Sequence, residues 1–139
     1  MSMKIGEPSC CVPSTVVGVW VGPFLHVGIV SDHRSFNGLP YVISNSARAG
    51  HGAEEPWDVF SGGRIVYQVD GLESALPWPV VLTRARNVLC KKWDLLGWNC
   101  EHFVREALGI RVESPQLQFV IWGGLGSFLL SSLVLSKKR

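Results

Sequence analysis

The feature that most restricts how this chain folds is an uncharged stretch near its C-terminus. From Ser114 to Ser136 no residue carries a charge, and the run from Phe119 to Leu135 reads FVIWGGLGSFLLSSLVL. A helix of that length with apolar side chains on every side is typical of a membrane span, and the basic Lys-Lys-Arg that follows it suits lipid headgroups. The sequence therefore predicts a C-terminal transmembrane helix, with a buried core helix as the alternative.

The rest of the chain has the size of one folded domain, because the whole sequence has 139 residues and a domain typically has ~100–150. We expect this domain over residues 1–113 and a membrane anchor with a basic tail over residues 114–139. The N-terminus, MSMKIGEPSCCVPS, lacks the apolar core of a secretory signal. These patterns predict a single-pass C-terminal anchor with the domain in the cytoplasm.

Charge and cysteine spacing exclude two classes of function. The net charge is +2, and Lys137, Lys138 and Arg139 carry the whole positive balance, so no nucleic-acid-binding surface is expected. The four cysteines form no Cys-x-x-Cys pair of the kind that binds zinc or performs redox chemistry. We therefore expect neither a metal nor another cofactor.

The N-terminal half of the domain has the composition of β-structure. Residues 15–30 are rich in β-branched and aromatic side chains and are broken by a Gly-Pro pair, which predicts two strands joined by a turn. The second of these strands covers residues 24–30. The same criteria predict two further strands, at residues 41–45 and 64–69, and a polar, glycine-containing loop at residues 47–56.

The C-terminal half predicts two helices. Residues 80–93 place apolar side chains close to the spacing of one helix face. In the second helix, Asn99 is a good N-cap, Glu101 suits the positive end of the helix dipole, and Gly109 ends the helix. An antiparallel sheet followed by helices is an α+β domain.

Cys100 falls on the first turn of this second helix. The unpaired amides and partial positive charge of a helix N-terminus stabilise a thiolate, so we expect a pKa below the free value of about 8.5 and a nucleophilic sulfur. Such a nucleophile needs a base. His26 lies in an otherwise apolar strand, where an imidazole needs a polar partner, and it is the candidate base.

The motifs around these two residues resemble those of a known family. His-Val-Gly-Ile-Val at residues 26–30 and Asn-Cys-Glu-His-Phe-Val at residues 99–104 are similar to motifs of the lecithin-retinol acyltransferase-like family, especially its small phospholipase A/acyltransferase members. The similarity covers residues 26–46 and 82–139 and leaves residues 47–81 unmatched. It implies a circularly permuted papain-like α+β fold that ends in a membrane helix.

The resemblance also implies an activity, that of a membrane-anchored, cysteine-dependent phospholipase A1/A2 and acyltransferase. His26 would take the proton of Cys100, and the thiolate would attack an acyl ester of a glycerophospholipid to form a thioester. The acyl group then passes to water, an amine or an alcohol. The expected partners are a phospholipid membrane and its glycerophospholipids, and the chemistry requires no metal.

The third catalytic residue departs from the family pattern. Family members commonly place a second histidine on the next strand, where this chain has Val-Ile-Ser-Asn at residues 42–45. Asn45 suits the role of the amide that orients the imidazole in papain-like proteases, Ser44 occupies the matching position, and His51 follows between two glycines. All three are candidates, in that order.

Two other classes of function stay open. A Cys–His pair on a papain-like scaffold cleaves amides as well as esters, so a thiol peptidase or amidase is one alternative. The other is a catalytically inert, membrane-tethered interaction module, in which the altered third position abolishes catalysis. Turnover of a lipid ester without peptide cleavage separates the acyltransferase from the peptidase.

Overall fold

A sheet of six strands forms the centre of the computed structural model, which describes residues 3–112 and 114–123. The strand order is β1-β6-β2-β3-β4-β5, and every neighbouring pair is antiparallel. The strands are β1 (Met3–Lys4), β2 (Val16–Val21), β3 (Phe24–Arg34), β4 (Pro40–Ser46), β5 (His51–Pro56) and β6 (Tyr67–Gln68).

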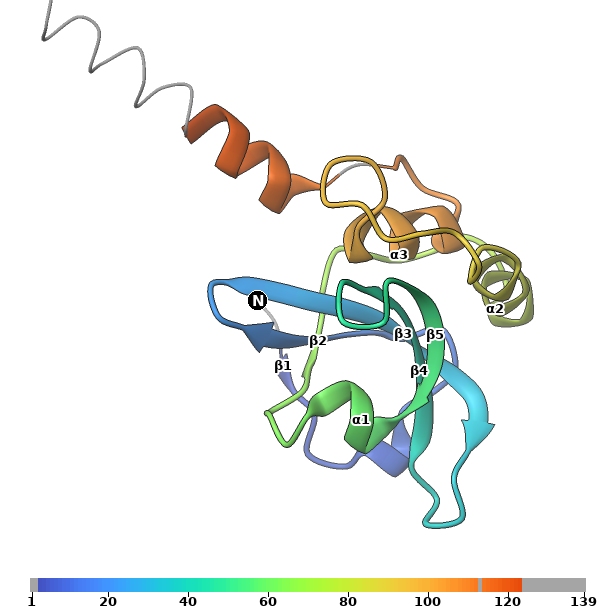
Figure 1. Cartoon of the computed structure of the whole chain (residues 1–139). Helices are drawn as coiled ribbons and strands as arrows, with labels where there is room; N and C mark the ends of the chain where they lie inside the picture. The colour runs from blue at the N-terminus through green and yellow to red at the C-terminus, as the bar shows by residue number, and fades with distance from the viewer. Residues whose placement is uncertain (1–2, 113, 124–139) are drawn as a thin grey trace, which may run out of the picture.

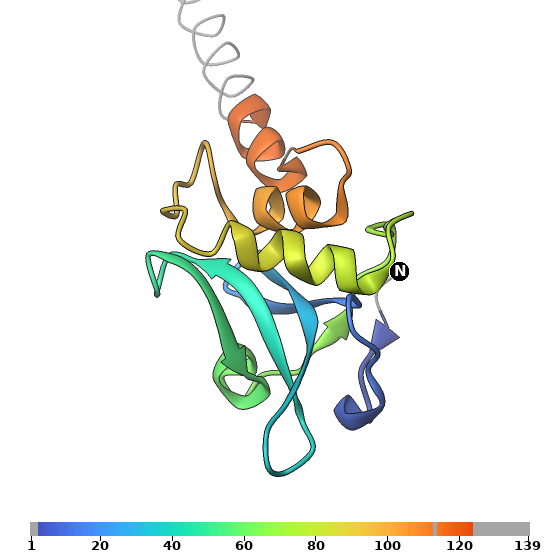
Figure 2. The ribbon, with the colours of Figure 1, turned by 90° about the vertical axis from the view of Figure 1, so that its right-hand side faces the viewer.

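Helices cover both faces of this sheet. α2 (Trp78–Asn87) and α3 (Cys100–Leu108) lie together on one face, and α1 (Trp57–Ser61) lies on the other (Figure 1). Residues 115–123 form a further helix that begins beside α3 and extends away from the sheet (Figure 2). A short 3₁₀ helix, Pro8–Cys10, precedes β2. The arrangement is compatible with the predicted α+β class.

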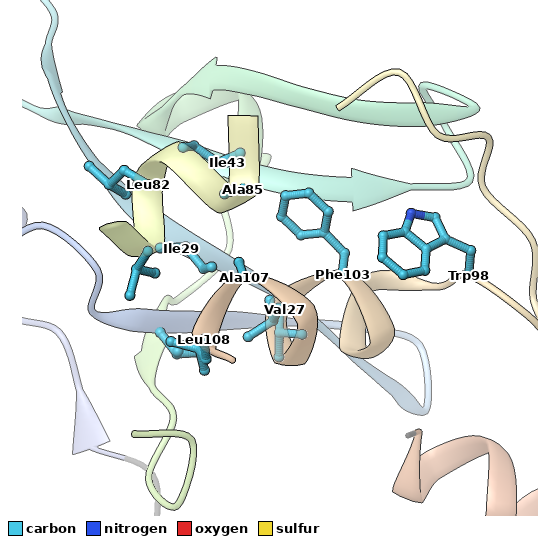
Figure 3. Close-up of a cluster of buried hydrophobic side chains, with 12 residues drawn as sticks. Val27, Ile29, Ile43, Leu82, Ala85, Trp98, Phe103, Ala107 and Leu108 are labelled. Atoms are coloured by element: carbon cyan, nitrogen blue, oxygen red, sulfur yellow. The ribbon is translucent and has the colours of Figure 1, made fainter. Parts of the chain in front are cut away.

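A separate hydrophobic core lies on each face of the sheet, because successive side chains of a strand point to opposite faces. On the α2 and α3 face, strand residues such as Val27 and Ile43 pack with Ala85 of α2 and Phe103 of α3 (Figure 3). On the α1 face, the buried cluster consists of Val17, Val19, Val30, Val42, Trp57, Phe60 and Val66.

Gly28 lets α1 come close to the sheet. A Cβ at this position would lie 2.6 Å from Cγ1 of Val42 and 3.1 Å from Cε2 of Phe60. The absent side chain leaves room for Phe60, whose ring centroid lies 5.4 Å from that of His26. The glycine of the His-Val-Gly motif therefore helps to place α1 beside the candidate base.

The ends of α3 are set by contacts within its own sequence. Oδ1 of Asn99 accepts hydrogen bonds from the N–H groups of Glu101 (3.0 Å) and His102 (3.2 Å), and Nδ1 of His102 accepts one from the Asn99 N–H (3.2 Å). This is a capping box with histidine in place of the usual glutamate or glutamine. Gly109 ends the helix at φ 70°. The predicted cap and C-terminal glycine are confirmed.

The segment after β4 differs from the prediction. The sequence predicts a loop over residues 47–56, whereas the structure has β5 there, followed directly by α1. β5 is an edge strand with polar side chains. One of them, Glu54, accepts hydrogen bonds from Arg86 of α2 at 2.8 and 3.1 Å. A polar edge strand carries no alternation of apolar residues from which to predict it.

The prediction of a transmembrane helix is wrong for the described chain. Among residues 3–112 and 114–123, no helix has both the length and the apolar character needed to cross a membrane. The helical residues 115–123 span about 14 Å at 1.5 Å per residue, against ~30 Å for the hydrocarbon core of a bilayer. The rest of the predicted anchor, residues 124–139, lies outside the described residues.

Phe103 offers a direct test of the larger core. Its side chain is completely buried, so we expect Phe103→Ala to lower the free energy of unfolding by about 3–5 kcal/mol through lost burial and the cavity left behind. Urea denaturation followed by circular dichroism measures this change. Phe36, fully exposed in the β3–β4 loop, is the matched control, and Phe36→Ala should leave the unfolding midpoint nearly unchanged. Equal effects of the two substitutions would contradict this packing.

Candidate active site

The site lies where the pairing between β3 and β4 stops. Gly28↔Ser44 is the last pair on this side, although β3 begins at Phe24 and stays paired with β2 along its whole first half. The edge of β3 beside His26 and Val27 is therefore open on the β4 side. A backbone N–H on an open strand edge is free to bond to another group.

Cys100, the first residue of α3, uses this open edge. Burial raises the pKa of its thiol above the ordinary value. The backbone N–H groups of Val27, Glu101 and Cys100 itself lower that pKa, but burial, together with the negative charge of Glu101, outweighs them. The expected depression of the thiol pKa is therefore wrong, since the helix N-terminus is present but desolvation is the larger effect. The Val27 contact places the sulfur next to the residue that follows His26.

His26 is partly buried on the α1 face of β3, where its ring contacts Phe60. Burial lowers the pKa of His26 to about 4, an effect that Glu55 opposes and Arg48 reinforces. At neutral pH the imidazole is therefore uncharged and able to accept a proton. The pair at rest consists of a protonated thiol and a neutral base, because burial disfavours the charged form of both groups.

Cys100 and His26 line one cavity of about 620 Å³. Its walls come from both faces of the sheet, so the cavity runs around the open edge of β3. We call its two sides the α1 arm and the α3 arm. The α1 arm is lined by Arg48, Glu55, Val59, Phe60 and Arg64, and the α3 arm by Trp93, Leu95, Gln116, Leu117 and Val120.

Gln116 joins the segments that carry the two candidate catalytic residues. Its Oε1 accepts a hydrogen bond from the Leu25 N–H (2.9 Å), and its Nε2 donates to the Leu25 carbonyl oxygen and to Oε1 of Glu101, both at 3.0 Å. Leu25 precedes His26, and Glu101 follows Cys100. The hydroxyl of Ser114 donates to the other oxygen of Glu101. These bonds hold β3 and the start of α3 in a fixed relation.

The three candidates for a third catalytic residue lie outside the cavity walls. Asn45 is fully buried, and its Nδ2 donates to the carbonyl oxygen of Trp98 at 2.8 Å. Ser44 is buried opposite Gly28, and Nδ1 of His51 lies 2.5 Å from the carbonyl oxygen of Gly52. Asn45 thus supports the loop that leads into Cys100. The catalytic assignment of each of these residues stays a prediction.

Sequence reasoning missed most of the side chains that complete the site. Gln116 lies in the stretch that the sequence predicts to be a membrane anchor. Its side-chain amide is the signal that this part of the stretch contacts protein, since a glutamine is unfavourable in a lipid-facing helix. Arg48, Glu55 and Phe60 belong to the segment without a recognised motif. No local pattern marks them, because they approach His26 only through the pairing of β4 with β5 and the packing of α1.

One group of side chains in the described residues has the composition of a metal site. Ligand atoms of Asp32, His33 and Glu54 lie within 4.8 Å of one another. The guanidinium of Arg86 already bonds to both carboxylates, with Nη2 at 2.6 Å from Asp32 and 2.8 Å from Glu54. A cation is therefore supplied by the chain itself, and these residues link β3, β5 and α2 as a structural ion-pair network.

Comparison with known proteins adds no family assignment. The chain matches no protein-family model, and none of the curated proteins matches it. The resemblance of residues 26–30 and 99–104 to the lecithin-retinol acyltransferase-like family therefore rests on those motifs alone.

The ring of His26 should titrate far below an ordinary histidine. Because burial lowers its pKa to about 4, the imidazole should stay neutral from pH 5 to pH 8 and gain its proton only in more acidic solution. NMR titration of the ring C–H signals measures the midpoint, and the spectrum of His26→Gln identifies the signals. A midpoint near 6.5 would contradict the burial of this side chain.

Asn45 and Ser44 can be separated by substitution. Asn45→Ala removes the donor to the buried Trp98 carbonyl, so we expect it to lower the free energy of unfolding by about 1–3 kcal/mol. The His26 titration midpoint should not move, because Asn45 bonds to the loop before Cys100 and not to the imidazole. Ser44→Ala should change neither quantity appreciably. A shifted midpoint in Asn45→Ala would instead favour a direct contact with His26.

Proposed function

We propose that this protein is a cysteine-dependent acyl hydrolase and acyltransferase that acts on the ester groups of glycerophospholipids. One observation supports this most directly: Cys100 and His26 line one cavity, and the backbone N–H of Val27, the residue after His26, lowers the pKa of the Cys100 thiol. A thiol and a neutral imidazole in this arrangement are the nucleophile and base of acyl transfer. The motif resemblance supplies the substrate class.

In the first step His26 accepts the thiol proton while the Cys100 sulfur attacks the carbonyl carbon of the ester. Proton transfer accompanies the attack, because neither group is charged at rest. The tetrahedral intermediate then loses its C–O bond, and the imidazolium returns the proton to the leaving alcohol oxygen. A lysophospholipid departs, and the acyl group stays on the sulfur as a thioester.

In the second step water, an amine or an alcohol attacks the thioester. His26 takes the proton of the incoming group, the C–S bond breaks, and the sulfur recovers that proton as a thiol. The backbone N–H groups of Val27, Glu101 and Cys100, which lower the pKa of the thiol, are the donors we assign to a negatively charged oxygen formed beside the sulfur.

The α3 arm suits an acyl chain. Trp93, Leu95, Leu117 and Val120 give it an apolar wall. Leu95 and Val120 are about half exposed, at 54% and 51%, so the arm opens to solvent. An acyl chain that enters here covers apolar surface otherwise in water, which contributes roughly 25 cal/mol per Å².

The test is a covalent acyl intermediate on Cys100. We expect the full chain, incubated with diacyl phosphatidylcholine in detergent micelles, to gain the mass of an acyl chain that hydroxylamine removes. Cys100→Ala should form no adduct, and His26→Ala should slow its formation by roughly 10²–10⁴-fold because the thiol loses its base. Intact-protein mass spectrometry follows the adduct, and lysophospholipid release follows turnover.

Cys90→Ala is the matched control, because Cys90 is an exposed thiol outside the cavity and its loss should leave adduct formation unchanged. Retention of lipid turnover by Cys100→Ala would refute the mechanism. The absence of both adduct and lysophospholipid in the unaltered chain would refute the lipid ester as substrate. Peptide cleavage in the same preparation would then favour the peptidase, and an unreactive chain the inert module.

A further inference from the structure

The two arms of the cavity differ in charge. The α3 arm is walled largely by apolar side chains, whereas the α1 arm carries Arg48, Glu55 and Arg64 within the same cavity. Nη2 of Arg48 bonds to both carboxylate oxygens of Glu55, at 2.7 and 2.8 Å. The carboxylate is largely shielded, at 18% exposure, while the Arg48 side chain is 63% exposed.

Arg64 is the cation of this arm whose charge is not balanced. It forms no ion pair with any residue that the structure describes, so its guanidinium donors are free for a ligand. Its guanidinium lies beside Gly62: this glycine has φ 56°, and a Cβ there would lie 2.9 Å from Nη1 of Arg64. Because Gly62 caps α1, the guanidinium lies near the end of that helix.

We propose that Arg64 and Arg48 form a subsite for the phosphodiester group of a glycerophospholipid substrate. Guanidinium groups bind phosphate oxygens through charge-assisted, often bidentate hydrogen bonds. Arg64 supplies the unbalanced positive charge. Arg48 supplies a second guanidinium, which also donates to Glu55. The inference rests on the proposed function, and it assigns the substrate's orientation: headgroup in the α1 arm, acyl chain in the α3 arm, scissile ester between them at Cys100.

The α1 arm lies within electrostatic reach of the catalytic centre. Glu55 raises and Arg48 lowers the pKa of His26, so charges at this end of the cavity act on the base. A substrate that occupies both arms lies next to Cys100 and His26, because these two residues line the same cavity. An anion held at one end and a chain held at the other restrict the ester between them to one approach.

Binding without chemistry tests this subsite. The full chain carrying Cys100→Ala is titrated by calorimetry with two ether lipids that cannot be hydrolysed, octylglycerophosphocholine and octylglycerol. They differ only in the phosphodiester headgroup. We expect the phosphodiester to bind at least about tenfold more tightly, and Arg64→Ala to remove most of that difference without changing the affinity for octylglycerol.

Glu55→Gln gives a prediction of opposite sign. It removes the negative charge and releases Arg48, so the phosphodiester should bind several-fold more tightly, which a merely structural ion pair would not produce. Arg64→Lys should lie between Arg64→Ala and the parent, because a lysine keeps the charge but not the fork of donors. Lys4→Ala, which removes an exposed charge outside this cavity, should have no effect.

Inorganic phosphate separates the two sources of this chemistry. Competition only at much higher concentration than the phosphodiester lipid agrees with a lipid subsite, while equally tight binding of phosphate alone would overturn the lipid assignment. Equal affinity for both ether lipids, or an unchanged affinity in Arg64→Ala, would overturn the subsite itself. Since no bond is cleaved, these outcomes do not depend on the acyl-adduct test of the proposed function.

Discussion

The site depends on one contact, between the first turn of α3 and the open edge of β3. Asn99 and His102 fix where the helix begins, and Phe103 anchors that turn in the core beneath it. The β3–β4 ladder ends at Gly28, which leaves the Val27 N–H available to the Cys100 sulfur. Closing the ladder by one further pair would deprive the sulfur of this donor.

Burial sets the charge state of both reactive groups. It raises the pKa of Cys100 and lowers the pKa of His26, so the pair at rest is neutral, although a helix N-terminus alone would favour a thiolate. The charges then arise only during acyl transfer, on two groups that burial has largely desolvated. Backbone N–H groups near the sulfur favour negative charge there, since each of them lowers the pKa of the thiol.

The segment after α3 contributes to the site through its few polar residues. Ser114 and Gln116 bond to Glu101, and Gln116 also bonds to the backbone of Leu25, so this segment connects the nucleophile's helix to the base's strand. The apolar residues Leu117 and Val120 then line the α3 arm of the cavity. The hydrogen bonds that join this mostly apolar segment to α3 and β3 therefore come from its polar side chains, Ser114 and Gln116.

The sequence by itself determined the elements whose signals are local: the strand that holds His26, the helix that begins at Cys100, and the cap and glycine that bound that helix. Only the tertiary structure decided what those elements meet. The edge strand β5 and α1 have no periodic apolar pattern, and they bring Glu55 and Phe60 toward His26 by strand pairing and packing. Desolvation likewise depends on all neighbours at once, which is why a helix N-terminus in the sequence predicted a lowered thiol pKa and the folded chain raises it.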